Sequence, residues 1–168
     1  ENLMAYTKNA KRPLIFFTDY AEIRDGNIVE SNKLLRIKRI MLFILRPKSM
    51  WGSRFARRRV LSMGSPICCP SITYYKPNLM EPVFLNGFRS NEDWEAEERI
   101  SQLDGEFIFC NKILTYHRIH EDSETSKIIH DSKRSEEDYA MYRKFWPSGI
   151  ARILTKLYSS SEKSNNIK

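Results

Sequence analysis

Runs of apolar residues separated by turn signals divide this chain into predicted strands and helices. Leu14 to Phe17 is a continuous apolar run directly after Pro13, a pattern typical of a buried central strand. Asp25-Gly26 is a turn signal that predicts a short hairpin after this strand. Further along, Phe107 to Cys110 and Ile113 to Tyr116 predict one more strand or a pair of strands.

Apolar positions at helical spacing predict the helices, and capping residues predict where they begin. Arg36, Lys38 and Arg39 are predicted to line the polar side of the first long helix. The predicted helices run up to Asn9, from Asn32 to about Leu45 before Pro47, from Trp51 to Leu61, from Ser90 or Asn91 to about Leu103, and beyond His120 to about Tyr158, with Pro147 starting the last one.

The order of these elements indicates the fold class. Gly64 to Tyr75 is predicted to be a loop leading into a strand over Ile67 to Ile72, which would lie beside Leu14 to Phe17. Strands interleave with helices and the last part is helical, so we expect an α/β domain with a mixed sheet over residues 1–120 and a helical C-terminal extension over 121–168.

The charge of the chain is concentrated in one region. The net charge is +7, and no Asp or Glu occurs from Lys33 through Lys76. Such a stretch favours an anionic partner, unless it is only a solvated basic face. Apolar residues such as Leu42, Phe43 and Trp51 beside these bases resemble an amphipathic surface and favour an anionic membrane surface as the partner. Arg57-Arg58-Arg59 would be a solvent-facing contact that could be replaced without affecting folding. No stacking platform or motif for nucleic acid is visible, so no nucleic-acid partner is expected.

The cysteines indicate a reducing compartment. Cys68, Cys69 and Cys110 are an odd number without disulfide or zinc spacing, and we expect small buried hydrophobic residues in strands. The longest apolar run, Ile40 to Leu45, is too short to span a bilayer.

Two neighbouring carboxylates open one of the predicted helices. Glu92 and Asp93 precede Trp94 in the first turn, where the helix dipole stabilises an ionised acid and a packed indole can fix its direction. Such an acid can serve as a general base. A plain N-terminal charge pair with Trp94 as a core anchor explains the same pattern.

A histidine-rich segment closes the strand that follows this helix. His117 and His120 lie three residues apart, so at most one faces any site on an extended strand. A neutral imidazole can bind a divalent cation beside carboxylates, although a structural histidine pair is the simpler explanation. His130 is predicted to lie on the surface.

Several segments, taken in order, resemble the C-terminal half of family 2 glycosyltransferases, which have the GT-A fold. The segments are Phe17-Thr18-Asp19-Tyr20, Gly64-Ser65-Pro66-Ile67-Cys68-Cys69-Pro70-Ser71, Asn91-Glu92-Asp93-Trp94-Glu95, Tyr116-His117-Arg118-Ile119-His120 and Glu136-Glu137-Asp138. The last is expected to stabilise a helix N-terminus and is assigned no chemistry.

This resemblance implies a set of roles. Asp93 would be the base that deprotonates the sugar acceptor, with Glu92 as the second choice; His120 would complete the metal and diphosphate site, with Arg118 as a phosphate contact. It implies a Mn²⁺ or Mg²⁺ ion, a nucleotide-sugar donor and a glycan or lipid-linked acceptor in cell-surface polysaccharide synthesis, at the cytoplasmic face of the membrane. Asp93 is expected to lie near His120.

The same resemblance implies a missing part. In this family a nucleotide-binding half ending in an Asp-x-Asp motif precedes the segment that here begins near Phe16, and the chain starts at Glu1 with no paired aspartates before that segment. We therefore expect the acceptor-side half of a longer enzyme, inactive alone. The alternatives are a metal-dependent nuclease, whose acids should sit on adjacent strands, and a basic interaction module without catalysis.

Overall fold

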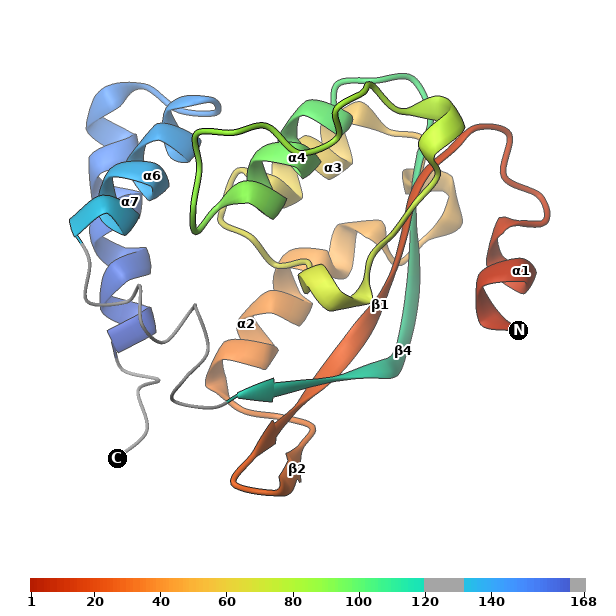
Figure 1. Cartoon of the computed structure of the whole chain (residues 1–168), viewed down its shortest axis with the longest axis horizontal. Helices are drawn as coiled ribbons and strands as arrows, with labels where there is room; N and C mark the ends of the chain where they lie inside the picture. The colour runs from red at the N-terminus through yellow and green to blue at the C-terminus, as the bar shows by residue number, and fades with distance from the viewer. Residues whose placement is uncertain (120–131, 164–168) are drawn as a thin grey trace.

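A computed structural model of the chain describes residues 1–119 and 132–163 as a mixed α/β fold (Figure 1). Two long strands cross the molecule, helix α1 lies at one end of it, and helices α6 and α7 lie together at the other end. The elements in order are α1 (Asn2–Thr7), β1 (Pro13–Arg24), β2 (Asn27–Val29), α2 (Lys33–Met41), η1 (Leu42–Leu45), η2 (Lys48–Met50), α3 (Arg54–Leu61), η3 (Cys69–Ser71), β3 (Thr73–Tyr74), η4 (Lys76–Asn78), α4 (Glu92–Ile100), β4 (Glu106–Ile119), α6 (Ser132–Arg143) and α7 (Ser148–Lys163).

Strand β1 is the centre of a mixed sheet of four strands. It pairs antiparallel with β2 and β3 and parallel with β4. Its residues from Leu14 to Ala21 are buried, so the predicted central strand is confirmed. The predicted hairpin is also confirmed, because Asp25 and Gly26 both have positive φ and Arg24 pairs with Asn27 across the turn.

The prediction of a strand over Ile67 to Ile72 is wrong. This segment contains the 3-10 turn η3, and the strand that follows it covers only Thr73 and Tyr74. Those two residues do pair with Phe16 and Ile15, so the expected neighbour of β1 is present but shorter. Prolines at 66 and 70 explain the difference, because they lack the N–H that a strand ladder needs.

Strand β4 is one continuous strand and not a pair of strands. Its register against β1 shifts near Asp19, where the pairing is irregular. The turn before it depends on Gly105, whose φ is +141° and where an added Cβ would lie 2.6 Å from the carbonyl oxygen of Arg12. Only glycine fits this close approach of β4 to the start of β1.

Side-chain caps define the two basic helices. The Asn32 side chain accepts a hydrogen bond from the N–H of Leu35 at 2.8 Å, which confirms the predicted cap of α2. Helix α3 begins at Arg54 after the cap Ser53, later than predicted, and Trp51 precedes it as a buried core residue. Pro47 ends the first helical region and Pro147 directly precedes α7, both as predicted.

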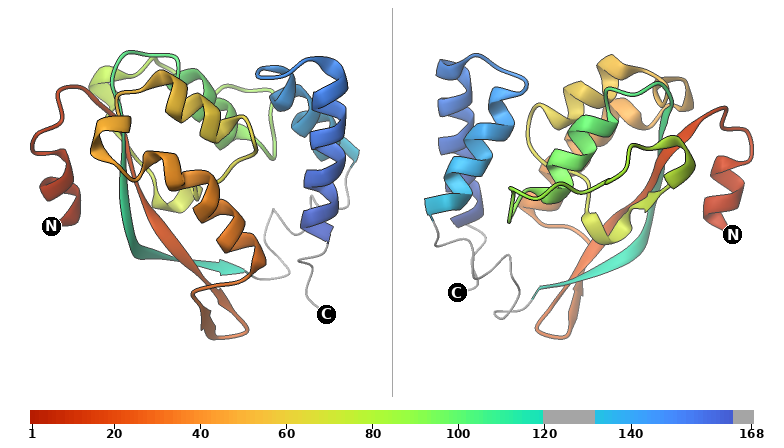
Figure 2. Two further views of the ribbon diagram at one scale, coloured as in Figure 1. Left: turned by 180° about the vertical axis from the view of Figure 1, so that it is seen from behind. Right: turned by 45° about the horizontal axis from the view of Figure 1, so that its top comes forward.

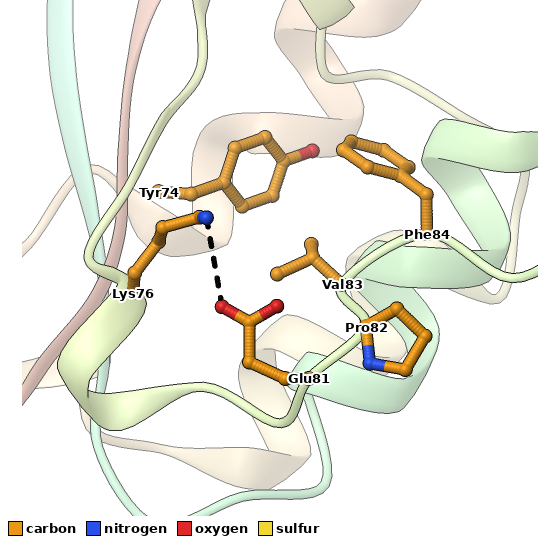
Figure 3. Close-up of a pocket in the computed structure, with 6 residues that line it drawn as sticks. All are labelled: Tyr74, Lys76, Glu81, Pro82, Val83 and Phe84. Atoms are coloured by element: carbon orange, nitrogen blue, oxygen red, sulfur yellow. Dashed lines mark ion pairs between the residues drawn. The ribbon is translucent and has the colours of Figure 1, made fainter.

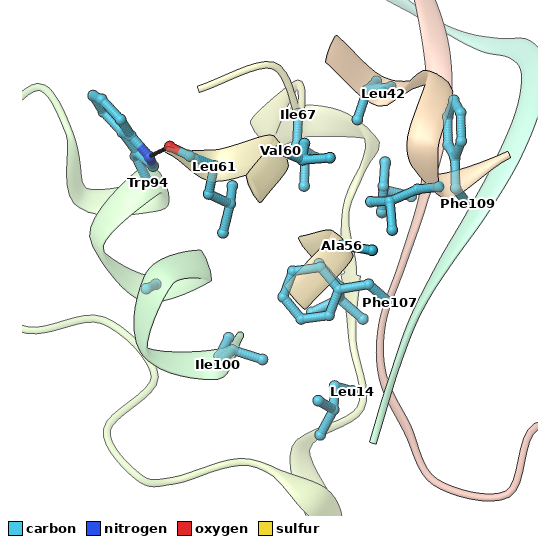
Figure 4. Close-up of a cluster of buried hydrophobic side chains, with 14 of the residues drawn as sticks. Leu14, Leu42, Ala56, Val60, Leu61, Ile67, Trp94, Ile100, Phe107 and Phe109 are labelled. Carbon is cyan, nitrogen blue, oxygen red and sulfur yellow. Dashed lines mark hydrogen bonds between the residues drawn. The ribbon is translucent and has the colours of Figure 1, made fainter. Parts of the chain in front are cut away.

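The main core joins the sheet to η1, α3 and α4 (Figure 4), and Met141, Tyr142 and Ala151 add α6 and α7 to it. Phe17 of β1 stacks on Phe109 of β4 with ring centroids 4.9 Å apart. On the helical side, the indole N–H of Trp94 donates to the carbonyl oxygen of Leu61, and Tyr142 meets the Trp94 ring edge-on. Helix α4 is therefore anchored by its buried Trp94, with α6 packed against the same side chain.

Candidate active site around Asp93

The first turn of α4 is held by carboxylates from α6. Asn91 occupies the cap position as predicted, but its side chain donates to Asp138 and makes no cap bond. Glu137 instead accepts hydrogen bonds from the backbone N–H groups of Arg89, Ser90 and Asn91 at 2.9, 2.9 and 3.2 Å. Glu137 and Asp138 thus fix the entry to α4, whereas Glu136 is exposed; the helix N-terminus that these acids stabilise is that of α4 and not that of their own helix.

The two candidate bases have different environments. Glu92 is exposed, whereas Asp93 is half-buried and accepts a hydrogen bond from the N–H of Trp94 at 2.8 Å. Burial raises the pKa of Asp93 above its usual value, while the Trp94 N–H and the positive charges of Lys38 and Arg134 oppose that rise. Of the two acids, only Asp93 has the partly desolvated carboxyl that suits a general base.

One helical turn further, Glu97 places a second carboxyl beside Asp93. Its side chain is fully buried, and neither carboxyl oxygen has a hydrogen-bond partner within the described residues. Burial and the charge of Asp93 raise the pKa of Glu97 well above its usual value, against the effect of Lys38. Burial without hydrogen-bond partners therefore favours the protonated, neutral form of this acid.

Lys38 on α2 supplies the positive charge of this region. Its ammonium lies 5.5 Å from the centre of the Tyr20 ring. Burial lowers the pKa of Lys38, but the neighbouring Tyr20, Cys68 and Asp93 outweigh it, so the pKa is raised and the ammonium stays charged. The prediction that Lys38 lies on a solvated helix side is therefore wrong.

Arg39 is also partly buried. Its guanidinium pairs with Asp19 at 2.8 Å and donates to the carbonyl oxygens of Glu30 and Tyr20. Asp19, part of the segment that resembles the glycosyltransferase family, is thus engaged in holding the hairpin against α2. Arg36 alone of the three bases predicted for that side is exposed.

Uncharged polar groups complete the surroundings of Asp93 and Glu97. The buried hydroxyl of Tyr74 has no hydrogen-bond partner in the described part of the chain, and burial together with the charge of Glu97 raises its pKa. Burial raises the pKa of the Cys68 thiol to about 12. Neither group is a nucleophile at neutral pH, because both remain protonated.

The cysteines differ in part from the prediction. All three are free thiols; Cys110 is buried in β4 as expected, whereas Cys68 is buried in a loop and Cys69 is exposed. The sequence did not distinguish the exposed member of the adjacent pair.

Arg57 was predicted to face solvent, and this prediction is wrong. Its side chain is fully buried and donates to the carbonyl oxygens of Ser101, Leu103 and Gly105, which connect α4 to β4. Burial and the neighbouring Arg54 lower its pKa to about 10, so it remains charged at neutral pH. Replacing it would therefore affect folding.

The predicted phosphate and metal contacts are only partly described. Arg118 is exposed on β4, opposite Ile23 of β1, and the half-buried His117 has its ring 6.3 Å from that of Tyr20. His120 and His130 lie outside the described residues, as does the predicted proximity of His120 to Asp93. No group of three metal-binding side chains converges within residues 1–119 and 132–163.

A pocket of about 280 Å³ lies between β3 and the segment before α4 (Figure 3). Tyr74 lines it, and its ring meets that of Phe84 edge-on. Lys76 and Glu81 form an exposed ion pair at 3.6 Å across the rim. None of the predicted catalytic or ligand-binding residues lines this pocket.

Comparisons with protein-family models, with curated proteins and with solved structures find no match to this chain.

Proposed function

We propose that this chain is the acceptor-side half of a GT-A glycosyltransferase resembling family 2, which transfers a sugar from a nucleotide-diphospho-sugar with inversion. The observation that carries this proposal is the environment of Asp93: a partly buried carboxyl in the first turn of α4, with a raised pKa and with the charge of Lys38 acting on it. This is the chemistry expected of a proton acceptor that works on a hydroxyl.

The proposed reaction uses Asp93 and its neighbours in simple steps. The acceptor hydroxyl oxygen forms a bond to the anomeric carbon, while the bond from that carbon to the diphosphate breaks and its electron pair leaves with the nucleoside diphosphate. Asp93 takes the hydroxyl proton, and Lys38 favours the ionised form of Asp93 before the transfer. The raised pKa of Glu97 favours its neutral form, which limits the negative charge beside the proposed base.

A divalent cation would neutralise the leaving diphosphate in such a reaction. The residues that the structure describes do not form a ligand set for it. The expected upstream Asp-x-Asp motif and His120 would hold this cation.

The nuclease alternative has less support. Its acids should lie on adjacent strands, whereas Asp93 and Glu97 share one helix and Asp19 of β1 is paired with Arg39. The interaction-module alternative gives no reason for the orphaned carboxyl of Glu97 under Asp93, since a buried acid without hydrogen bonds is costly.

The experiment that tests the proposal is nucleoside diphosphate release by the intact gene product. UDP-, GDP- and dTDP-sugars are each supplied with Mn²⁺ or Mg²⁺, and released diphosphate is measured with and without EDTA. We expect release from at least one donor and loss of that release with EDTA. A gene product that releases diphosphate from none of them, or that cleaves duplex DNA instead, would contradict the proposal.

A further inference from the structure

Three helices gather on one face of the molecule. In the left-hand view of Figure 2, helices α2, α3 and α7 lie nearest the viewer, with α4 and α6 behind them. No Asp or Glu occurs in α2 or α3, or in the connection between them. We call this side, formed by the exposed residues of these helices and of η1, the helical face.

The helical face combines exposed apolar residues with exposed bases. On α2 and η1, Ile40 is 73% exposed and Phe43 is 65% exposed. On α3, Phe55 is 68% exposed, and on α7 Ile153 and Leu157 are 60% and 62% exposed. The exposed bases beside them on the same elements are Lys33, Arg36, Arg46, Arg54, Arg59, Arg152 and Lys156.

Two of these bases, Arg46 and Arg59, lie over aromatic side chains. The guanidinium of Arg46 lies 5.3 Å from the centre of the Phe43 ring. Arg59 lies 5.4 Å from the Phe55 ring and 5.2 Å from the Trp146 ring, which links α3 to the turn before α7. Bases stacked on exposed aromatic rings are the arrangement expected where rings enter an apolar layer and cations remain at its charged boundary.

We propose that the helical face docks on an anionic lipid surface. Along α2, η1 and α3 all the charged side chains are basic, and they complement anionic headgroups. Three of the five exposed apolar residues named above are aliphatic, and aliphatic side chains suit the acyl boundary of a membrane but cannot stack on the bases of a single-stranded nucleic acid. No helix within the described ranges is long and apolar enough to cross a membrane. This inference is independent of the proposed function.

Sedimentation with vesicles tests the charge of the face. The full-length protein is mixed with vesicles of phosphatidylglycerol and phosphatidylcholine in equal parts, or of phosphatidylcholine alone, at low and high salt. K33Q/R36Q/R46Q removes charge from the helical face, and K8Q/K11Q/R12Q removes the same charge from exposed residues near α1. Because each base near the surface contributes about fivefold to binding, the first variant should bind about one hundredfold more weakly and the second should bind almost as the wild type does.

A second pair of variants tests insertion. Ile40 and Met4 are each 73% exposed, but only Ile40 lies on the helical face. I40S should bind the anionic vesicles about tenfold more weakly, whereas M4S should not change binding. Circular dichroism confirms that all four variants are folded.

Four results would overturn the proposal: no binding of the wild-type protein to anionic vesicles, equal weakening by the two charge variants, equal binding by I40S and the wild type, or charge-dependent binding to duplex DNA in place of vesicles. The last result would assign the face to nucleic acid.

Discussion

Replacing Arg57 with Ala should destabilise the protein strongly, because its guanidinium joins the end of α4 to the start of β4. Three carbonyl oxygens, those of Ser101, Leu103 and Gly105, accept its hydrogen bonds, and Ser101 is fully buried. Hydrogen bonds from a charged donor contribute about 1.5–3 kcal/mol each, and solvent can reach two of these carbonyls, since Leu103 and Gly105 are only partly buried. We therefore expect a loss of about 3–4 kcal/mol in the free energy of unfolding.

Urea unfolding followed by tryptophan fluorescence measures this loss. With a slope of about 2 kcal/mol per molar urea, the midpoint should fall by about 1.5–2 M. R54A is the matched control, because Arg54 lies on the same helix but is exposed and pairs with the exposed Asp104 at 2.7 Å. That variant should change the free energy of unfolding by less than about 1 kcal/mol. A loss below about 1 kcal/mol for Arg57→Ala would refute the role of Arg57 as the clamp of α4.

Three other perturbations have expected outcomes. Glu137→Ala should lower the free energy of unfolding in urea by about 2 kcal/mol, whereas Glu136→Ala, at an exposed neighbour, should change it almost not at all. Burial opposes ionisation of Glu137, but the hydrogen bonds from Ser90 and the adjacent N–H groups outweigh it and lower the pKa. The difference in stability between the wild type and Glu137→Ala should therefore shrink as the pH falls through that pKa. Because the pKa of Glu97 is raised in the folded state, the wild type should lose up to about 1.4 kcal/mol of stability per pH unit as the pH rises above the unfolded pKa near 4.5. Glu97→Gln should remove this loss. Parallel pH dependences of the wild type and the variant would exclude a protonated Glu97 in the folded protein. Lys38→Met removes a positive charge that lowers the pKa of Asp93, so the acid limb of the profile of kcat/KM against pH should move to higher pH. An acid limb that does not move would show that Lys38 does not act on Asp93.

The sequence predicted those elements that are determined by their own residues, without contacts from distant segments. The apolar run from Leu14 to Phe17 needs burial on both faces, and it forms the central strand. Asn32 acts through its own side-chain cap and Pro147 through its own fixed backbone, so the helix starts beside them were also predicted. The strand expected over Ile67 to Ile72 failed because its prolines outweigh its apolar residues.

The site was predicted only in part, because burial in it depends on distant segments. Asp93 and Glu92 differ little in sequence, and the packing of α4 leaves only Asp93 partly desolvated. Nothing in the sequence marked Glu97 as buried, since a glutamate on a helix is most often exposed. Arg57 likewise resembles its neighbours in an arginine run, yet carbonyl groups from more than forty residues away surround it.

Lys38 shows the same dependence on distant segments. Helical spacing assigned Lys38 to the polar side of α2, but in the structure its ammonium lies near the Tyr20 ring and is stabilised by the charge of Asp93. The burial of Lys38 could have been predicted only with the knowledge that α2 and α4 lie over the same part of the sheet.

The most direct test of the account is the turnover of the intact gene product carrying Asp93→Asn, with Glu92→Gln as the matched control. Asn keeps the shape of the side chain but cannot take a proton, so turnover at saturating donor should fall by about one hundredfold or more, while the donor Kd from calorimetry remains unchanged. Glu92→Gln should keep turnover within about twofold of the wild type, because Glu92 is exposed. Undiminished turnover in Asp93→Asn would contradict the assignment of Asp93 as the base, and a selective loss in Glu92→Gln would transfer that role to Glu92.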